Sequence, residues 1–311
     1  MQTRTSIVAP LAGVAALSTA AFVHHRTWQA ERRNPPRGRF AEVDGVRLHY
    51  VDRGSGVPLV MLHGLGSMVE ELALSPTYEA LVARHRVIAI DRPGYGHSSR
   101  PRGRWLGPRR QAALVRKLLA QIGVERPVVF GHSFGALVAI AYALAYPAAL
   151  RGLVLASGAY FPTPRLDVPL MAPPAIPFLG ALMRHTISPL IGRALWPAMT
   201  RLVFSPAPVP AYFSRFPVWM ALRPSQLRAG AQEAAMLLPA TAALAPLYPK
   251  LEISPVIAVG ALDRYVDPRA HSLRLAQSVP RRELVVSPRA GHMLHHSDPR
   301  RVLQAIEMSF S

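Results

Sequence analysis

Short apolar runs bounded by turn residues recur along most of the chain. They read PLVMLHG, RVIAID, RPVVFGHS, RGLVLAS, SPVIAVGALD and ELVVS, and such runs are typical of strands buried on both faces of a parallel sheet. Helical patterns separate most of them, over 108–122, 134–146, 268–278 and 299–308. Ahead of them, FAEVD and VRLHYVDRG alternate apolar and polar residues around Asp44-Gly45, which predicts a hairpin. The pattern predicts an α/β fold whose mostly parallel sheet has helices on both faces.

One connection is too long for this scheme, because ordinary links between strands and helices take only a few residues. Residues 161–245 are rich in proline and in aromatic side chains, and they carry short helical patterns. This composition favours a helical cap inserted in the core over a disordered linker, which would lack the apolar content. We therefore expect a core formed by 40–160 and 246–311, with the cap at 161–245.

The N-terminal segment has a pattern of its own. Residues 6–23 are uncharged and rich in alanine, valine and leucine, and at 18 residues they reach the lower limit of a membrane-spanning helix. Arginines follow this stretch more densely than they precede it, which favours an uncleaved anchor over residues 1–25 with the catalytic domain in the cytoplasm. The alternative is a cleaved signal peptide with small residues Ser18 and Ala20 at its end, followed by export. Residues 26–39 are polar and basic, as a linker would be.

Charge and cysteine content narrow the function classes. The formal net charge is +19, yet the 36 basic residues are scattered and all but Lys117 and Lys250 are arginine. A basic patch interleaved with aromatic residues, as single-stranded nucleic acid requires, is not evident, so we expect no nucleic-acid partner. The chain has no cysteine, which excludes disulfides, thiolate chemistry and cysteine-bound zinc.

A candidate nucleophile lies in the sequence GHSFG. Ser133 directly follows the apolar run RPVVF and precedes the helical run ALVAIAYALAY, as in the strand, sharp turn and helix of a G-x-S-x-G motif. Gly131 and Gly135 flank it because the turn strains the backbone and leaves no space for a Cβ on either side. His132 is expected to be structural.

A serine hydroxyl needs a base to take its proton, and histidine has a suitable pKa. His292, in AGHML, follows the last apolar run and precedes the last helical pattern, where the order Ser, Asp, His puts the base. His295 and His296 are close alternatives, expected to be exposed or to pack. Asp263 ends the run SPVIAVGALD, directly after the expected strand, and is the expected acid, whereas Asp267, followed by a proline, is typical of an N-cap.

Acyl transfer also needs donors for an oxyanion. The sequence HGLGS follows the run PLVML, and its glycines allow backbone N–H groups to turn toward the site. We assign the oxyanion hole to the N–H groups of Leu65 and Phe134. No cofactor and no metal are expected.

From about Phe40 to its end the chain resembles the α/β-hydrolase superfamily, in the branch of esterases, carbon-carbon hydrolases, epoxide hydrolases and non-haem haloperoxidases. HGLG, DRPGYGHS, GHSFG, GALDRYVDP and GHM carry the resemblance. It implies an eight-stranded α/β-hydrolase fold with an inserted cap, a triad of Ser133, Asp263 and His292, and a structural role for 91–98. The chain departs from epoxide hydrolases and haloalkane dehalogenases, which have an aspartate at the position of Ser133.

The leading hypothesis is a membrane-associated serine esterase that acts on a small hydrophobic acyl substrate. Carbon-carbon bond hydrolysis or perhydrolysis on the same triad is the alternative, and a non-catalytic, membrane-tethered binding protein is the second. The aromatic cap holds only Asp167 and Glu233 as acids, so we expect an apolar pocket.

Overall fold

The computed structural model describes residues 5–164 and 167–310, with the side chains of 13–164 and 168–310. Its centre is one eight-stranded sheet in the order β1-β2-β4-β3-β5-β6-β7-β8. The two strands at one edge form the antiparallel hairpin expected around Asp44-Gly45, and β2 is also antiparallel to β4. All other neighbours are parallel. The strands are β1 (Arg39–Val43), β2 (Val46–Arg53), β3 (Pro58–Leu62), β4 (Arg86–Ile90), β5 (Val128–His132), β6 (Gly152–Ala156), β7 (Pro255–Gly260) and β8 (Glu283–Ser287). The predicted α/β-hydrolase fold is confirmed.

Helices cover both faces of the sheet because successive strand side chains point to opposite sides. Val60 and Leu62 of β3 pack with α4 and α5, whereas Leu59 and Met61 pack with α3 and α13. The core helices are α2 (Val69–Leu74), α3 (Pro76–Val82), α4 (Pro108–Gln121), α5 (Phe134–Ala145), α11 (Arg274–Ser278), α12 (Leu294–Ser297) and α13 (Pro299–Met308). Both faces of the sheet are therefore buried away from water, as its continuously apolar strands require.

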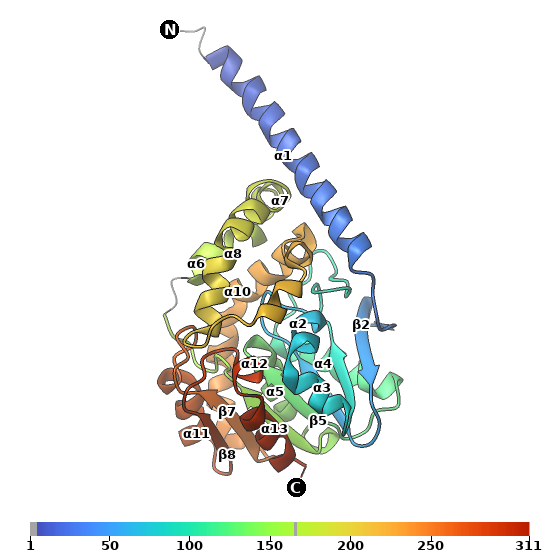
Figure 1. Cartoon of the computed structure of the whole chain (residues 1–311), viewed down its shortest axis with the longest axis vertical. Coiled ribbons are helices and arrows are strands. Elements are labelled where there is room, and N and C mark those ends of the chain that lie inside the picture. Colours follow the sequence, from blue (N-terminus) through green and yellow to red (C-terminus); the bar gives the residue numbers. More distant parts are fainter. Residues whose placement is uncertain (1–4, 165–166, 311) are drawn as a thin grey trace.

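The inserted cap lies over the carboxyl ends of the strands (Figure 1). It consists of α6 (Asp167–Met171), α7 (Leu179–His185), α8 (Ile187–Phe204), α9 (Val218–Ala221) and α10 (Pro224–Leu244). Its aromatic residues Phe204, Phe213 and Phe216 form a small core of their own, which also takes in Met68 and Met293 from the loops beneath. Part of the cap's apolar content thus serves to attach it to the core.

The N-terminal residues form α1 (Thr5–Arg33), one long helix that projects beyond the rest of the molecule (Figure 1). Residues 26–33, expected as part of a linker, continue this helix, so that only 34–38 connect it to β1. Within the described part of the chain, no helix is long and apolar enough to cross a membrane. The expected spanning segment, 6–23, begins in residues 6–12, whose side chains lie outside the described part.

A buried ion pair joins the cap to the core. Glu233 of α10 is fully buried, and its Oε1 accepts a hydrogen bond from Arg92 Nη1 at 2.7 Å. Its Oε2 accepts from the Tyr95 hydroxyl at 2.7 Å, and Gln111 Nε2 donates to Oε1 at 2.6 Å. The carboxylate is fully paired, which a buried charge requires.

Removing this carboxylate would leave the Arg92 charge buried without its partner. We expect Glu233→Ala to lower the free energy of unfolding by about 3–5 kcal/mol, measured by urea denaturation. The matched control is Glu79→Ala, because the Arg53–Glu79 ion pair is exposed on both sides and should cost at most about 1 kcal/mol. Equal losses in the two variants would contradict the structural role of Glu233.

Candidate active site

The turn between β5 and α5 holds Ser133 in a strained conformation. Its φ is 55° and its ψ is −119°, a region that residues with a side chain rarely adopt. A Cβ on Gly131 would lie 2.4 Å from the carbonyl oxygen of Gly135, and a Cβ on Gly135 would lie 2.2 Å from that of Leu62. Only glycine fits at both positions, so the turn stays sharp and Ser133 lies at the N-terminus of α5.

His292 and Asp263 lie on the loops that follow β8 and β7. His292 Nδ1 is 2.8 Å from Asp263 Oδ2, and both side chains are buried. The other carboxylate oxygen of Asp263 accepts hydrogen bonds from the backbone N–H groups of Tyr265 and Val266, at 2.8 and 2.9 Å. This arrangement fixes the aspartate and leaves Nε2 of the imidazole for a second partner.

The alternative acid, Asp267, has a different environment. Its Oδ1 accepts from the backbone N–H groups of Arg269 and Ala270, at 2.7 and 3.4 Å. Asp267 therefore satisfies the first turn of the following helical segment, as an N-cap does, and Asp263 is the aspartate in contact with His292.

The loop that bears His292, here called the base loop, lies directly against the end of β5, the strand that precedes Ser133. His132 Nε2, next to Ser133 in the chain, is 3.0 Å from the carbonyl oxygen of His292, and the two rings are 4.9 Å apart. Burial, together with the neighbouring histidines, lowers the pKa of His132 well below its usual value. His132 is thus a neutral spacer that donates its Nε2 proton to the base loop, in keeping with the structural role expected for it.

The HGLGS loop approaches both Ser133 and His132. A Cβ on Gly64, the residue before Leu65, would be 3.1 Å from Ser133 Cβ and 3.6 Å from its Oγ. Arg92 holds this loop from behind, because its Nε donates to the His63 carbonyl at 2.8 Å and its Nη2 to the Gly64 carbonyl at 2.9 Å. The N–H of Phe134 begins α5, where first-turn N–H groups have no partner within the helix. Leu65 and Phe134, whose N–H groups are the expected oxyanion donors, are thus the residues that follow Gly64 and Ser133 in the chain.

A buried carboxylate cluster beside the site was missed by the sequence reasoning. Glu71 Oε1 accepts from Nε2 of His295 at 2.5 Å and from Nε2 of His296 at 2.8 Å, while Oε2 accepts from the Ser67 hydroxyl at 2.9 Å. Burial alone would raise the pKa of Glu71, but the charge and hydrogen bonds of the two histidines hold it well below its usual value. The cluster ties the helix after the oxyanion loop to the helix after the base.

His295 and His296 are therefore neither exposed nor alternatives in contact with Asp263. Glu71, His132 and His295 could in principle hold a metal ion, since three of their donor atoms lie within 4.8 Å of one another. An ion at about 2 Å from each ligand does not fit between Glu71 and His295 while their hydrogen bond persists. We interpret the group as a hydrogen-bonded cluster that positions the two loops.

Comparison with known proteins places this geometry in context. A family model described as alpha/beta hydrolase fold matches residues 57–299. A 2-hydroxy-6-oxo-2,4-heptadienoate hydrolase of Pseudomonas putida is 31% identical over 194 residues, which cover 59% of this chain and 69% of that protein.

Two solved structures are similar over most of the chain. An esterase of Thermogutta terrifontis has a TM-score of 0.70 at 23% identity and covers 87% of this chain and 97% of its own. A membrane phospholipase A has a TM-score of 0.66 at 23% identity and covers 98% of this chain and 95% of its own. At these identities the two structures show a shared fold.

His63, at the start of the oxyanion loop, generates a pH prediction. Burial, followed by the Arg92 charge, lowers its pKa from 6.5 to about 4, and its Nε2 accepts from the Arg92 backbone N–H at 3.0 Å. Above pH 6.5 the His63 side chain is neutral in both the folded and the unfolded state. As the pH falls below 6.5, His63 binds a proton in the unfolded chain but not in the folded protein. The free energy of unfolding therefore decreases.

We expect up to about 3 kcal/mol of this loss to come from His63. Urea denaturation of His63→Asn should show lower stability near pH 7 but a flatter decline toward pH 5 than the wild type. The exposed His24→Gln is the control and should keep the wild-type decline. An unchanged decline in His63→Asn would show that His63 does not titrate in this way.

Proposed function

The chain belongs to the alpha/beta hydrolase fold family and is a hydrolase of that type; from this premise we propose that it is a serine hydrolase that cleaves an ester or a related acyl bond. The hydrogen bond between His292 and Asp263, 2.8 Å long and buried beside the strained Ser133, carries the proposal. Binding alone would require neither this oriented imidazole nor the strained turn, which argues against a non-catalytic, membrane-tethered binding protein.

The proposed reaction follows from the roles of these groups. Ser133 Oγ attacks the acyl carbon while His292 Nε2 takes its proton, and Asp263 stabilises the imidazolium through Nδ1. The N–H groups of Leu65 and Phe134 donate to the oxyanion. His292 then gives the proton to the leaving group, and water, activated by the same imidazole, releases the acid from the acyl-enzyme.

The second candidate is carbon-carbon bond hydrolysis on the same triad. It is favoured by the 31% identity with the 2-hydroxy-6-oxo-2,4-heptadienoate hydrolase. Perhydrolysis would use the same residues with hydrogen peroxide in place of water. A parallel assay of the purified enzyme with that dienoate, with peroxide and with simple esters would rank the three activities by kcat/KM.

We further propose that the substrate is hydrophobic. Met68, beside the oxyanion loop, and Met293, beside the base, both pack with the aromatic residues of the cap. Of the two acids of the cap, Glu233 is engaged by Arg92 and is not available to a ligand, while the side chain of Asp167 lies outside the described residues. Apolar surroundings of this kind bind acyl chains and leave a charged substrate poorly solvated.

Association with a membrane is part of the proposal. Its support is the apolar segment 6–23 at the N-terminal end of α1, whose side chains Val14 and Leu17 are 61% and 73% exposed. A membrane phospholipase A shares this fold over 98% of the present chain. Membrane association would bring the enzyme close to hydrophobic esters dissolved in lipid.

The triad proposal predicts that Ser133→Ala abolishes labelling by a fluorophosphonate probe and lowers ester turnover by at least about 10³-fold. His292→Ala should lower turnover as strongly because the members act as a unit, and Asp263→Asn should be somewhat milder. The control is Ser287→Ala, which changes a buried serine at the end of β8 and should leave labelling intact. Normal turnover in His292→Ala would overturn the assignment.

The hydrophobic-pocket proposal predicts a rise in kcat/KM for p-nitrophenyl esters from acetate toward hexanoate, because each added methylene contributes about 0.8 kcal/mol on burial. Acyl groups of similar length that carry a charge should be turned over poorly. A flat profile, or equal turnover of charged acyl groups, would show that the apolar residues of the cap serve packing alone.

A further inference from the structure

The outer side of the cap is unusually apolar. Of the exposed large apolar side chains in the described residues, eleven lie on 170–202, four on 14–28, and five elsewhere. Phe178, at the start of α7, is 91% exposed and Leu170 is 80% exposed. We call the eleven side chains the cap face: Leu170, Ile176, Phe178, Leu179, Leu182, Ile187, Leu190, Ile191, Leu195, Met199 and Leu202. A concentration of this kind marks an interaction surface.

The cap face follows the period of α8. Except for the adjacent Leu190 and Ile191, successive members on this helix are three or four residues apart, which places them on one side. The buried residues of α8, Pro189, Thr200 and Phe204, occupy the other side, against the rest of the cap. The helix therefore has two apolar sides, of which only one is needed for the fold.

The charge around the cap face is of one sign. Residues 168–232 contain no aspartate or glutamate but six arginines. Arg193, Arg201 and Arg215 are exposed, and none of them forms an ion pair with a described residue. An apolar surface on a segment that carries arginines and no carboxylate complements an anionic lipid surface.

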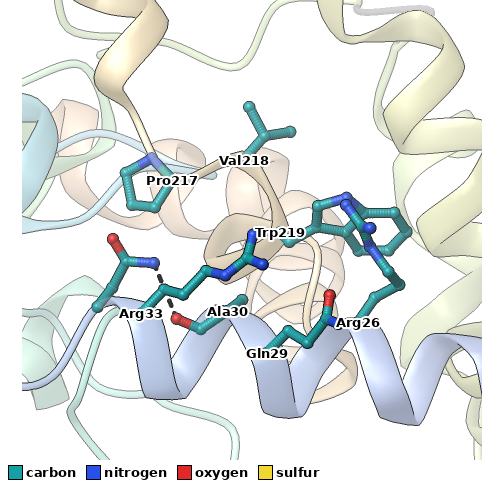
Figure 2. A pocket seen from close by; sticks show the side chains of 8 residues that line it. Arg26, Gln29, Ala30, Arg33, Pro217, Val218 and Trp219 are labelled. Atoms are coloured by element: carbon teal, nitrogen blue, oxygen red, sulfur yellow. Dashed lines mark hydrogen bonds between the residues drawn. The ribbon is translucent and has the colours of Figure 1, made fainter.

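Contacts with Trp219 of α9 and with Arg223 fix α1 to the cap. The ring centroids of Phe22 and of Trp219 in α9 are 6.0 Å apart, and the Arg26 guanidinium lies over the Trp219 ring, 4.9 Å from its centroid. Farther along α1, Arg223 Nη1 donates to Glu31 at 2.9 Å. Figure 2 shows Trp219 and Arg26 side by side at the small cavity between α1 and α9. The N-terminal half of α1, with exposed Val14 and Leu17, thus projects past α7 from a fixed base (Figure 1).

We propose that the cap face docks on an anionic lipid bilayer, with its leucine, isoleucine and phenylalanine side chains among the lipid acyl chains and arginines of the cap at the headgroups. The inference rests on the membrane association proposed above and adds the surface, beyond α1, that makes the contact. Docking there would hold the cap, and the acyl site beneath it, against the lipid that supplies the substrate.

A second copy of the chain fits this surface less well. A twofold interface would bring the same patch onto itself, so two surfaces that carry arginines and no carboxylate would meet. Residues 168–232 offer no carboxylate to pair with them, and like charges brought together across an interface cost several kcal/mol. The phosphates of an anionic bilayer supply the missing negative charge.

The experiment is flotation of the full chain with vesicles of phosphatidylcholine, alone or mixed with phosphatidylglycerol. A cap-face variant carries Phe178→Ser, Leu182→Ser and Leu195→Ser with α1 intact. The matched control carries Trp105→Ser, Leu284→Ser and Val286→Ser, which are exposed apolar residues away from the cap face. We expect the cap-face variant to lose at least about tenfold in partitioning to the mixed vesicles, and the control to bind like the wild type.

Hydrolysis of a soluble p-nitrophenyl ester separates this inference from the function it rests on. We expect the cap-face variant to keep wild-type kcat/KM on that ester, which also shows that it is folded. Equal flotation of the variant and the wild type, or equal binding to both kinds of vesicle, would overturn the proposal. The proposal would also be overturned if the wild type were a dimer and the cap-face variant a monomer that still binds the vesicles. If neither the wild type nor the two variants hydrolysed the ester, the proposed chemistry would be overturned instead.

Discussion

The fully buried pair of Arg92 and Glu233 holds together three parts of the structure that the chemistry needs at once. Arg92 pairs with Glu233 of α10, donates to the carbonyls of His63 and Gly64 in the oxyanion loop, and lies 4.9 Å from the ring of Phe134, the residue after the nucleophile. A buried ion pair adds little net stability over an apolar pair, but losing one partner is costly. The pair therefore enforces one arrangement of cap, loop and turn.

The same constraint determines which groups stay neutral near the site. The Arg92 charge adds to burial in lowering the pKa of His63 to about 4, so the histidine keeps a lone pair for the Arg92 backbone N–H. The Glu71 carboxylate accepts from His295 and His296, and the ring of His295 lies 4.5 Å from that of His132, the residue before Ser133. Two buried charged clusters thus flank the nucleophile, and each fixes one loop. Preorganised donors of this kind need no rearrangement when negative charge develops.

Much of the fold and the central residues of the site were predictable because their signals are local. The strands are continuous apolar runs. The turn at Ser133 is indicated by Gly131 and Gly135, because a Cβ at either position would collide with backbone atoms. The supporting clusters were not predictable, because Arg92 and Glu233, or Glu71 and His295, are far apart in the chain and only the folded sheet brings them together. A lone glutamate in an aromatic cap looks like a surface or pocket residue until its partner is known.

The cap connects the outer surface with the chemistry through one helix. One side of α8 carries much of the cap face, while its last turn reaches the base loop, where the Met293 N–H donates to the Val203 carbonyl at 3.2 Å. Just beyond, a Cβ on Gly291 would collide with the Ser205 carbonyl oxygen, so the loop that bears His292 lies flat against the end of α8. The helix α8 therefore lies between the outer surface of the cap and the loop that bears His292.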